Sequence, residues 1–139
     1  MTRLATDFEA FIQDQLLMTT TPGSNLVPET ELWGVADRTF VGRISIRHEL
    51  NDALRVVGGH IGYDTARKFR GRGLATEMLR LALPIAKSLG LARVLLTCDD
   101  TNVPSIKVIE ANAGVLEGVR ANDPNKPRKR YYWIDLQTI

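Results

Sequence analysis

The sequence predicts a mixed α/β fold, with a central sheet and flanking helices, and three observations carry this prediction. Strand-like and helix-like segments alternate along residues 57–136. Residues 73–89 place apolar side chains at helical spacing, which is typical of a helix packed on a sheet. Residues 92–98 form a continuous apolar run, which favours a strand covered on both faces. The length of 139 residues allows a single domain, residues 1–139.

The first third of the chain is predicted to hold one helix and one hairpin. Phe8, Phe11 and Ile12 fall at helical spacing, so we expect an amphipathic helix over residues 7–17. Alternating apolar and polar residues predict the two hairpin strands. A loop is predicted before the hairpin, over residues 19–28. The hairpin strands are predicted at residues 31–36 and 40–48. The segment after the hairpin, residues 50–56, is compatible with either a short helix or a loop.

A glycine-rich strand and a capped helix follow. The strand predicted over residues 57–65 carries three glycines, and glycines this close together favour the approach of a ligand to the backbone. Asn102, with Pro104 just behind it, is suited to cap a helix over residues 102–114. The last two strands and the polar loop between them are predicted at residues 115–119, 131–136 and 121–130.

Composition narrows the function classes. The formal net charge is only +2, so the overall charge does not call for a nucleic-acid partner. Cys98 is the single cysteine, and the N-terminus resembles no signal peptide, so we expect a cytoplasmic protein with neither disulfides nor a membrane segment. Two histidines and one cysteine without ligand spacing predict no metal site. Basic residues concentrate at 67–72 and 126–130, and we interpret the second group as a solvated loop.

Residues 67–75 form the most informative segment, a basic turn between a predicted strand and a predicted helix. A helix start offers unpaired backbone N–H groups and the positive end of the helix dipole. Gly71 and Gly73 can take positive φ and leave the backbone open to a phosphate. The segment therefore predicts a phosphate-bearing ligand.

The motif Arg70-x-x-Gly73-x-Ala75 matches the pyrophosphate motif R/Q-x-x-G-x-G/A of the GNAT N-acetyltransferases. Residues 102–114 are similar to the second core motif of that family, and the likeness covers residues 31–139. The chain most resembles a bacterial branch of predicted acetyltransferases. The resemblance implies a GNAT-like sheet and acetyl-CoA as co-substrate, without a metal.

Carried over to this sequence, the resemblance implies a site for acetyl-CoA. The backbone amides of residues 71–76 would surround the pyrophosphate, and residues 62–65 would pair with the pantetheine arm. Sheet pairing would open between this strand and the one that ends at Cys98. The implied cofactor-binding residues are Gly62, Tyr63, Asp64, Thr65, Arg70, Gly71, Arg72, Gly73, Leu74, Ala75, Thr76, Asn102 and Ser105.

Two departures from the family pattern bear on assembly and mechanism. The first strand of the family is expected to be missing, because only the helix over residues 7–17 precedes the hairpin. An uncovered hairpin edge invites pairing, so we expect a homodimer or a less stable domain. Many members carry a tyrosine that protonates the departing thiolate, and the matching position in this sequence is Ile109. If a general acid is needed, Tyr63, Tyr131 or a water must therefore supply the proton.

Acetyl transfer to a primary amine of a small molecule or peptide is the predicted reaction, by direct transfer in a ternary complex. His60 is the candidate base and Tyr63 the second candidate catalytic residue, although His60 could equally hydrogen-bond inside the sheet. Cys98 as an acyl-carrying nucleophile is the less favoured route. The hairpin region carries three acids that favour a cationic amine as the acceptor: Glu29, Glu31 and Glu49.

Two other functions remain open at this point. A GNAT-like domain that binds CoA without catalysis would explain Ile109 and the expected missing strand. A nucleic-acid-binding module is a distant third, based on the two basic segments and residues 131–133. We expect no nucleic-acid and no membrane partner.

Overall fold

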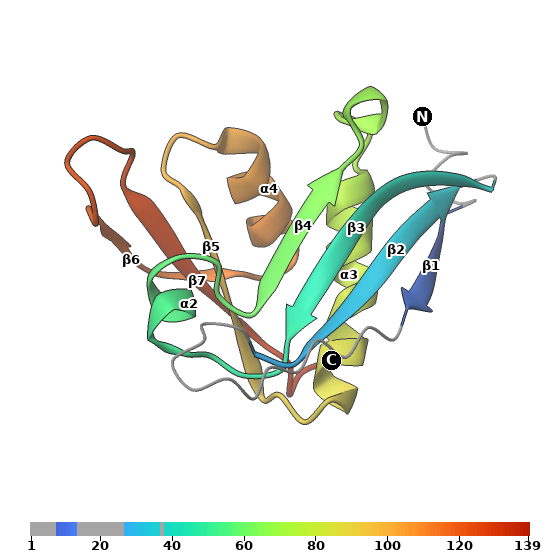
Figure 1. The fold of residues 1–139 in the computed structure, drawn as a ribbon, viewed down its shortest axis with the longest axis horizontal. Coiled ribbons are helices and arrows are strands. Elements are labelled where there is room, and N and C mark those ends of the chain that lie inside the picture. The colour runs from blue at the N-terminus through green and yellow to red at the C-terminus, as the bar shows by residue number, and fades with distance from the viewer. Residues whose placement is uncertain (1–7, 14–26, 37) are drawn as a thin grey trace.

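The computed structural model describes residues 8–13, 27–36 and 38–139, and these residues form two antiparallel sheets with helices packed against them (Figure 1). In chain order the elements are β1 (Phe8–Gln13), β2 (Glu29–Ala36), β3 (Thr39–Arg47), α2 (Asp52–Val56), β4 (Ile61–Thr65), the 3-10 helix η1 (Arg67–Phe69), α3 (Leu74–Ser88), β5 (Arg93–Asp99), α4 (Val103–Ala111), β6 (Val115–Arg120) and β7 (Lys129–Asp135). The mixed α/β class predicted from the sequence is confirmed.

The two sheets part between β4 and β5. The first sheet has the order β1-β2-β3-β4 and the second β5-β7-β6. They touch just before β4, where the backbone N–H of His60 donates to the Leu95 carbonyl at 2.7 Å and that of Gly58 to Thr97 Oγ1 at 2.9 Å. Among the described strands, β4 pairs with β3 only along residues 61–65, so its second edge faces the opening. The predicted opening of the sheet is therefore present (Figure 1).

The helix α3 covers the first sheet and supplies much of the core. Leu79, Ala82 and Ala86 are fully buried along one of its faces, at the helical spacing seen in the sequence. Gly42 of β3 lets the helix come close, because a Cβ there would lie 2.9 Å from Met78 Cε. The helix continues through Pro84, as predicted.

The helix predicted over residues 7–17 is wrong. Within that range the structure describes the strand β1, which pairs antiparallel with β2 from Phe8 opposite Ala36 to Gln13 opposite Glu31. The free edge of β2 supplies hydrogen-bond partners for this segment, and aromatic and β-branched residues suit a strand. Tertiary pairing thus overrides the helical spacing. Residue 7 and residues 14–17 lie outside the described residues.

The same strand corrects what we expected at the hairpin edge. A strand does precede the hairpin, and β1 lies on the outer edge of β2 that was predicted to be uncovered. An open β2 edge therefore no longer argues for the homodimer, which stays a prediction without that support.

The other elements follow the sequence closely, with one shift. The hairpin, the helix after the basic turn and the Asn102 cap are confirmed. The strand expected from residue 57 begins only at Ile61, because Gly58 and Gly59 take φ of +107° and +61° and form a turn. None of the described helices is long and apolar enough to cross a membrane.

Candidate functional site

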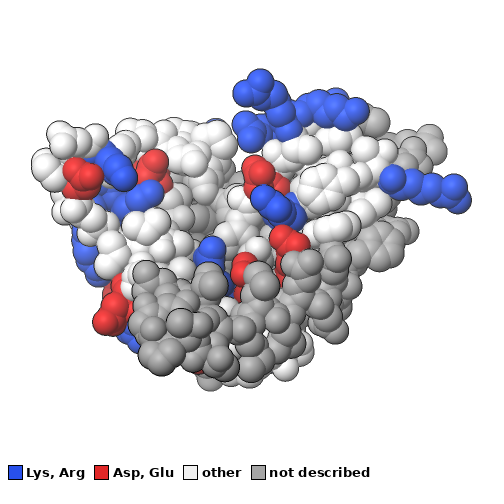
Figure 2. Space-filling view, viewed as in Figure 1, with Lys and Arg blue, Asp and Glu red and all other residues white. Residues whose placement is uncertain are grey.

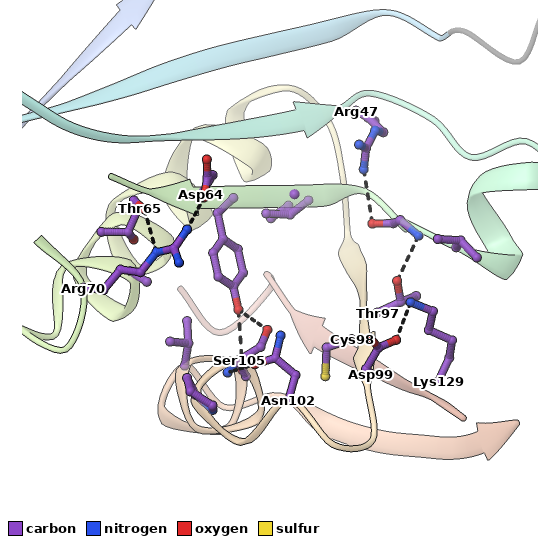
Figure 3. A pocket seen from close by; sticks show the side chains of 18 residues that line it. Arg47, Asp64, Thr65, Arg70, Thr97, Cys98, Asp99, Asn102, Ser105 and Lys129 are labelled. Atoms are coloured by element: carbon purple, nitrogen blue, oxygen red, sulfur yellow. Dashed lines mark hydrogen bonds and ion pairs between the residues drawn. The ribbon is translucent and has the colours of Figure 1, made fainter. Parts of the chain in front are cut away.

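The opening between the two sheets is a cleft of about 590 Å³ (Figure 3). One wall is β4, and the other is formed by the end of β5 and the start of α4. Eight of the predicted site residues line this cleft together, although they come from separate parts of the chain. They are Gly62, Tyr63, Asp64, Thr65, Arg70, Ala75, Asn102 and Ser105.

A second cavity of about 550 Å³ adjoins the cleft at the start of α3. The predicted residues Gly71, Gly73, Leu74 and Thr76 line it, and it shares Thr65, Arg70 and Ala75 with the cleft. In Figure 2, Lys and Arg side chains gather at the upper rim, over the turn between β4 and α3 and beside a notch in the surface. The cavity and the cleft together make one continuous groove.

The glycines of the turn have the conformation that the sequence predicted. Gly71 and Gly73 have φ of +78° and +76°, and the space where a Cβ would stand is empty to 4 Å at both positions. Gly73 is the N-cap of α3, so the first N–H groups of the helix start here. A turn at a helix start with two glycines that leave the backbone open, and with cations around it, fits an anion such as a pyrophosphate.

Arg70 is held at the rim of this groove. Its Nε donates to the Thr65 carbonyl at 3.1 Å, and its Nη2 lies 3.6 Å from Asp64 Oδ1. Arg72 lines neither cavity, and its guanidinium lies over the Phe69 ring, 5.7 Å from the centroid. Of the two arginines predicted to add charge, only Arg70 therefore reaches the groove in this conformation.

Tyr63 points into the cleft and meets α4. Its hydroxyl oxygen lies 2.5 Å from Ser105 Oγ. Burial raises the pKa of the Tyr63 hydroxyl above its ordinary value, and the hydrogen bond with Ser105 lowers it in part. Asn102 fixes the start of α4, because its side chain accepts from the backbone N–H of Ser105 at 3.2 Å. Tyr63 is thus a protonated hydroxyl held at the centre of the cleft.

His60 does not line the cleft. Its side chain is only 7% exposed, and its Nδ1 accepts the backbone N–H of Leu95 at 2.8 Å. Burial, with the charges of nearby arginines, lowers the pKa of His60 to about 4. A neutral ring whose acceptor nitrogen is already used joins the two sheets, so the geometry favours the structural interpretation over the catalytic one.

Two further candidates are also unsuited to the reaction, one by its protonation and one by its position. Burial raises the pKa of the Cys98 thiol, which lines the cleft but keeps its proton at neutral pH. The hydroxyl of Tyr131 donates to the Val56 carbonyl at 2.8 Å inside the core. Tyr63 is the tyrosine that remains available.

Four polar residues lie at the far end of the cleft, and three of them, Arg47, Thr97 and Lys129, were not predicted as site residues; the fourth is Asp99, an acid near the end of a predicted strand. Lys129 and Arg130 were interpreted as part of a solvated loop. Both instead begin β7: Lys129 Nζ lies 2.6 Å from Asp99, the last residue of β5, and Arg130 pairs with Asp100, just after that strand. Only the strand register could have revealed this, because it places Lys129 opposite Asp99.

Comparison with known proteins now identifies the family. Residues 5–114 match the family profile described as an acetyltransferase (GNAT) domain. The chain belongs to the GNAT acetyltransferase family. No curated protein matches the chain.

Solved structures agree with this assignment. A probable acetyltransferase is similar with 25% identity and a TM-score of 0.64, over 80% of this chain and 64% of that one. A putative acetyltransferase from Salmonella typhimurium, solved with acetyl-CoA, has 13% identity, a TM-score of 0.62 and coverages of 78% and 65%. A spermidine N-acetyltransferase variant from Vibrio cholerae has 17% identity, a TM-score of 0.65 and coverages of 79% and 67%. The chain spans less than two thirds of the first of these proteins.

The GNAT assignment explains why the groove combines an anion site with a splayed sheet. Among the described residues, no group of three His, Cys, Asp or Glu side chains could hold a metal ion.

Proposed function

We propose that this GNAT protein transfers an acetyl group from acetyl-CoA to a primary amine of a small molecule or peptide. The transfer is direct, within a complex that holds both substrates. The observation that carries the proposal is the placement of the Tyr63 hydroxyl between the anion-binding turn and the polar far end of one continuous groove. The donor and the acceptor can then enter from opposite ends.

The donor fits the residues that are present. The open turn at Gly71 and Gly73 and the first N–H groups of α3 would hold the pyrophosphate, with Arg70 beside them. The edge of β4 that faces the cleft offers backbone N–H and C=O groups to an extended pantetheine arm, as an added strand would need. Bound acetyl-CoA would supply the thioester, and Tyr63 would be the hydroxyl available to it in the cleft.

The chemistry needs a proton for the departing thiolate. As the amine nitrogen forms a bond to the acetyl carbon and the C–S bond breaks, Tyr63 donates its proton to sulfur, while the nitrogen releases its extra proton to solvent water, from which Tyr63 is reprotonated. The raised pKa keeps this hydroxyl protonated at neutral pH. Ser105, at 2.5 Å, orients the hydroxyl and can pass a proton back to it.

A CoA-binding domain without catalysis is the second candidate, because Ile109, at the usual position of the family tyrosine, is completely buried. Calorimetry with acetyl-CoA and a thiol-release assay over a panel of amines separate the two. We expect binding, and turnover with at least one amine. Binding without turnover on any amine would favour the second candidate, and absence of binding would refute both.

A further inference from the structure

The cleft has two chemically different sides. Successive side chains of a strand point to opposite faces of the sheet. Tyr63 of β4 and Cys98 of β5 lie on the side of the helices, where the Tyr63 hydroxyl meets Ser105. Their neighbours Gly62 and Thr97 lie on the other side. The side of the cleft that faces the helices therefore holds the hydroxyl proposed to act on the thioester, and the opposite side is left for the acceptor.

The strand registers extend this acceptor side to β3 and β7. Gly62 pairs with Ser45, and Arg47 lies two residues further along β3 on the same face. On the other wall, Asp99 pairs with Lys129. Arg47 and Lys129 both line the cleft, and Figure 3 shows them at the end away from Arg70.

Carboxylates near the cleft are already compensated by cations. Asp99 lies 2.6 Å from Lys129 Nζ, and Asp64 lies 3.6 Å from Arg70 Nη2. Glu31, one of the acids that suggested a cationic acceptor, lies 3.9 Å from Arg43. These acids therefore add little net negative charge with which to bind a polycation.

Arg47 differs from these cations. Its Nη1 donates to the carbonyls of Gly58 and Gly59 at 3.2 and 3.1 Å, so its contacts there are neutral. Among the described residues, no carboxylate forms an ion pair with it. The absence of a side chain at Gly62 leaves Nη2 beside the strand, 3.4 Å from where a Cβ would stand. Its positive charge, with those of Arg55 and Arg93, is also felt by the buried His60.

On the basis of the acetyl transfer proposed above, we infer that the acceptor is a primary amine that carries a carboxylate close to the amino group, and that Arg47 binds this carboxylate. A guanidinium held by two carbonyls presents its remaining N–H groups in a fixed orientation, which suits a carboxylate. A polyamine would bring like charge towards Arg47.

Matched substrates test this inference directly. A panel of amino acids, their carboxamides and spermidine is assayed for CoA release with the wild-type protein. We expect kcat/KM for the preferred amino acid to exceed that for its carboxamide by at least about 10-fold, which corresponds to one charge-assisted contact. The amino group of an amino acid is more basic than that of its carboxamide, so a smaller fraction of it is neutral and able to attack. A preference for the amino acid would therefore come from binding of the carboxylate.

Variants on one strand face assign the preference to Arg47. Arg47→Gln should reduce the carboxylate preference by about 10-fold, mainly through KM, and Arg47→Lys should keep part of it. Arg43→Gln is the matched control, because Arg43 lies on the same face of β3, is exposed and does not line the cleft. It should leave the preference unchanged.

The outcomes separate the inference from the proposed function. Turnover of carboxamides or spermidine as efficiently as amino acids would overturn the inference and keep the acetyltransferase. An unchanged preference in a folded Arg47→Gln protein would likewise overturn it. If Arg47→Gln does not fold, the wild-type substrate pairs and Arg47→Lys still decide. Failure of every amine would refute the proposed function, and the inference with it.

Discussion

The hydroxyl oxygen of Tyr63 lies 2.5 Å from Ser105 Oγ, and this contact joins β4 to the first turn of α4 across the cleft. The position of Ser105 depends in turn on Asn102, whose side chain caps the helix. A helix cap therefore sets the position of the candidate acid. The usual tyrosine position of the family is occupied by the buried Ile109, and the hydroxyl comes from the facing strand instead.

Tyr63→Phe should lower kcat by about 100-fold or more, because general acids contribute about 10² to 10⁴ to rates. The Kd for acetyl-CoA should stay nearly the same, because the ring and its packing are retained. Stopped assays of acetyl transfer and calorimetry measure the two quantities. Because burial raises the pKa of Tyr63, the wild-type kcat should fall only above the ordinary tyrosine pKa of about 10, and the variant should lack that decline.

Tyr132→Phe is the control for this variant. Tyr132 is fully buried in β7, and its hydroxyl bonds to Glu110 at 2.8 Å, outside the cleft lining. Its loss should reduce stability and leave kcat unchanged in the folded protein. Equal kcat losses in both variants would argue against Tyr63 as the acid.

Gly73→Val should block the anion site at the start of α3. The φ of +76° makes any β-branched residue strained there, at a cost of about 1–3 kcal/mol, so a loss of stability accompanies the loss of binding. Gly90→Val is the matched control. Gly90 has φ of +93°, the space where its Cβ would stand is equally empty, and it lies at the other end of α3. We expect the acetyl-CoA Kd to rise about 100-fold, or about 3 kcal/mol, in Gly73→Val alone. Similar affinities in the two variants would contradict the assignment of the turn.

His60 should make stability depend on pH. Its pKa is about 4 in the folded protein and 6.5 in the ordinary state, so between these values the unfolded chain binds a proton that the folded chain does not. Stability is therefore complete above pH 6.5 and declines as the pH falls towards 4, by up to about 3 kcal/mol.

His60→Asn tests both this linkage and the catalytic alternative. The asparagine oxygen can still accept the Leu95 N–H, while the titrating group is removed. Urea unfolding at pH 5 and pH 7 should show a smaller pH difference in the variant than in the wild type. Largely retained kcat is expected, and a loss of several orders of magnitude in a folded variant would restore His60 as the base.

Local patterns predicted those parts of the fold that local forces decide. The stripe of α3, the Asn102 cap and the positive φ of Gly71 and Gly73 all follow from neighbouring residues. The segment that forms β1 failed, because its helical spacing is equally compatible with pairing to β2, and only the tertiary structure supplies that edge. Secondary structure there is decided by partners between 18 residues away, for Gln13 and Glu31, and 28 residues away, for Phe8 and Ala36.

The turn at the start of α3 and the cap of α4 were predictable for the same reason, since a contiguous motif and one cap define them. The far end of the cleft was not predictable, because Arg47, Thr97 and Lys129 come from three strands and meet only through their registers. For His60, the structure disfavours the catalytic role that was predicted from the sequence. Its ordinary pKa suggested a base, but burial and a backbone hydrogen bond give it a structural role.

Gly59→Ala should damage the junction between the sheets. Gly59 has φ of +61°, and an added Cβ would press against the carbonyl oxygen of Leu95, the group that accepts the N–H of His60. Gly71→Ala is the matched control, because it carries the same kind of backbone strain, at φ of +78°, with open space around the Cβ. The free energy of unfolding from urea titrations should fall by about 2–3 kcal/mol more for Gly59→Ala than for Gly71→Ala. Equal losses would mean that the contact between Gly59 and Leu95 can relax without cost, and that the two sheets are held together by their cores rather than by this junction.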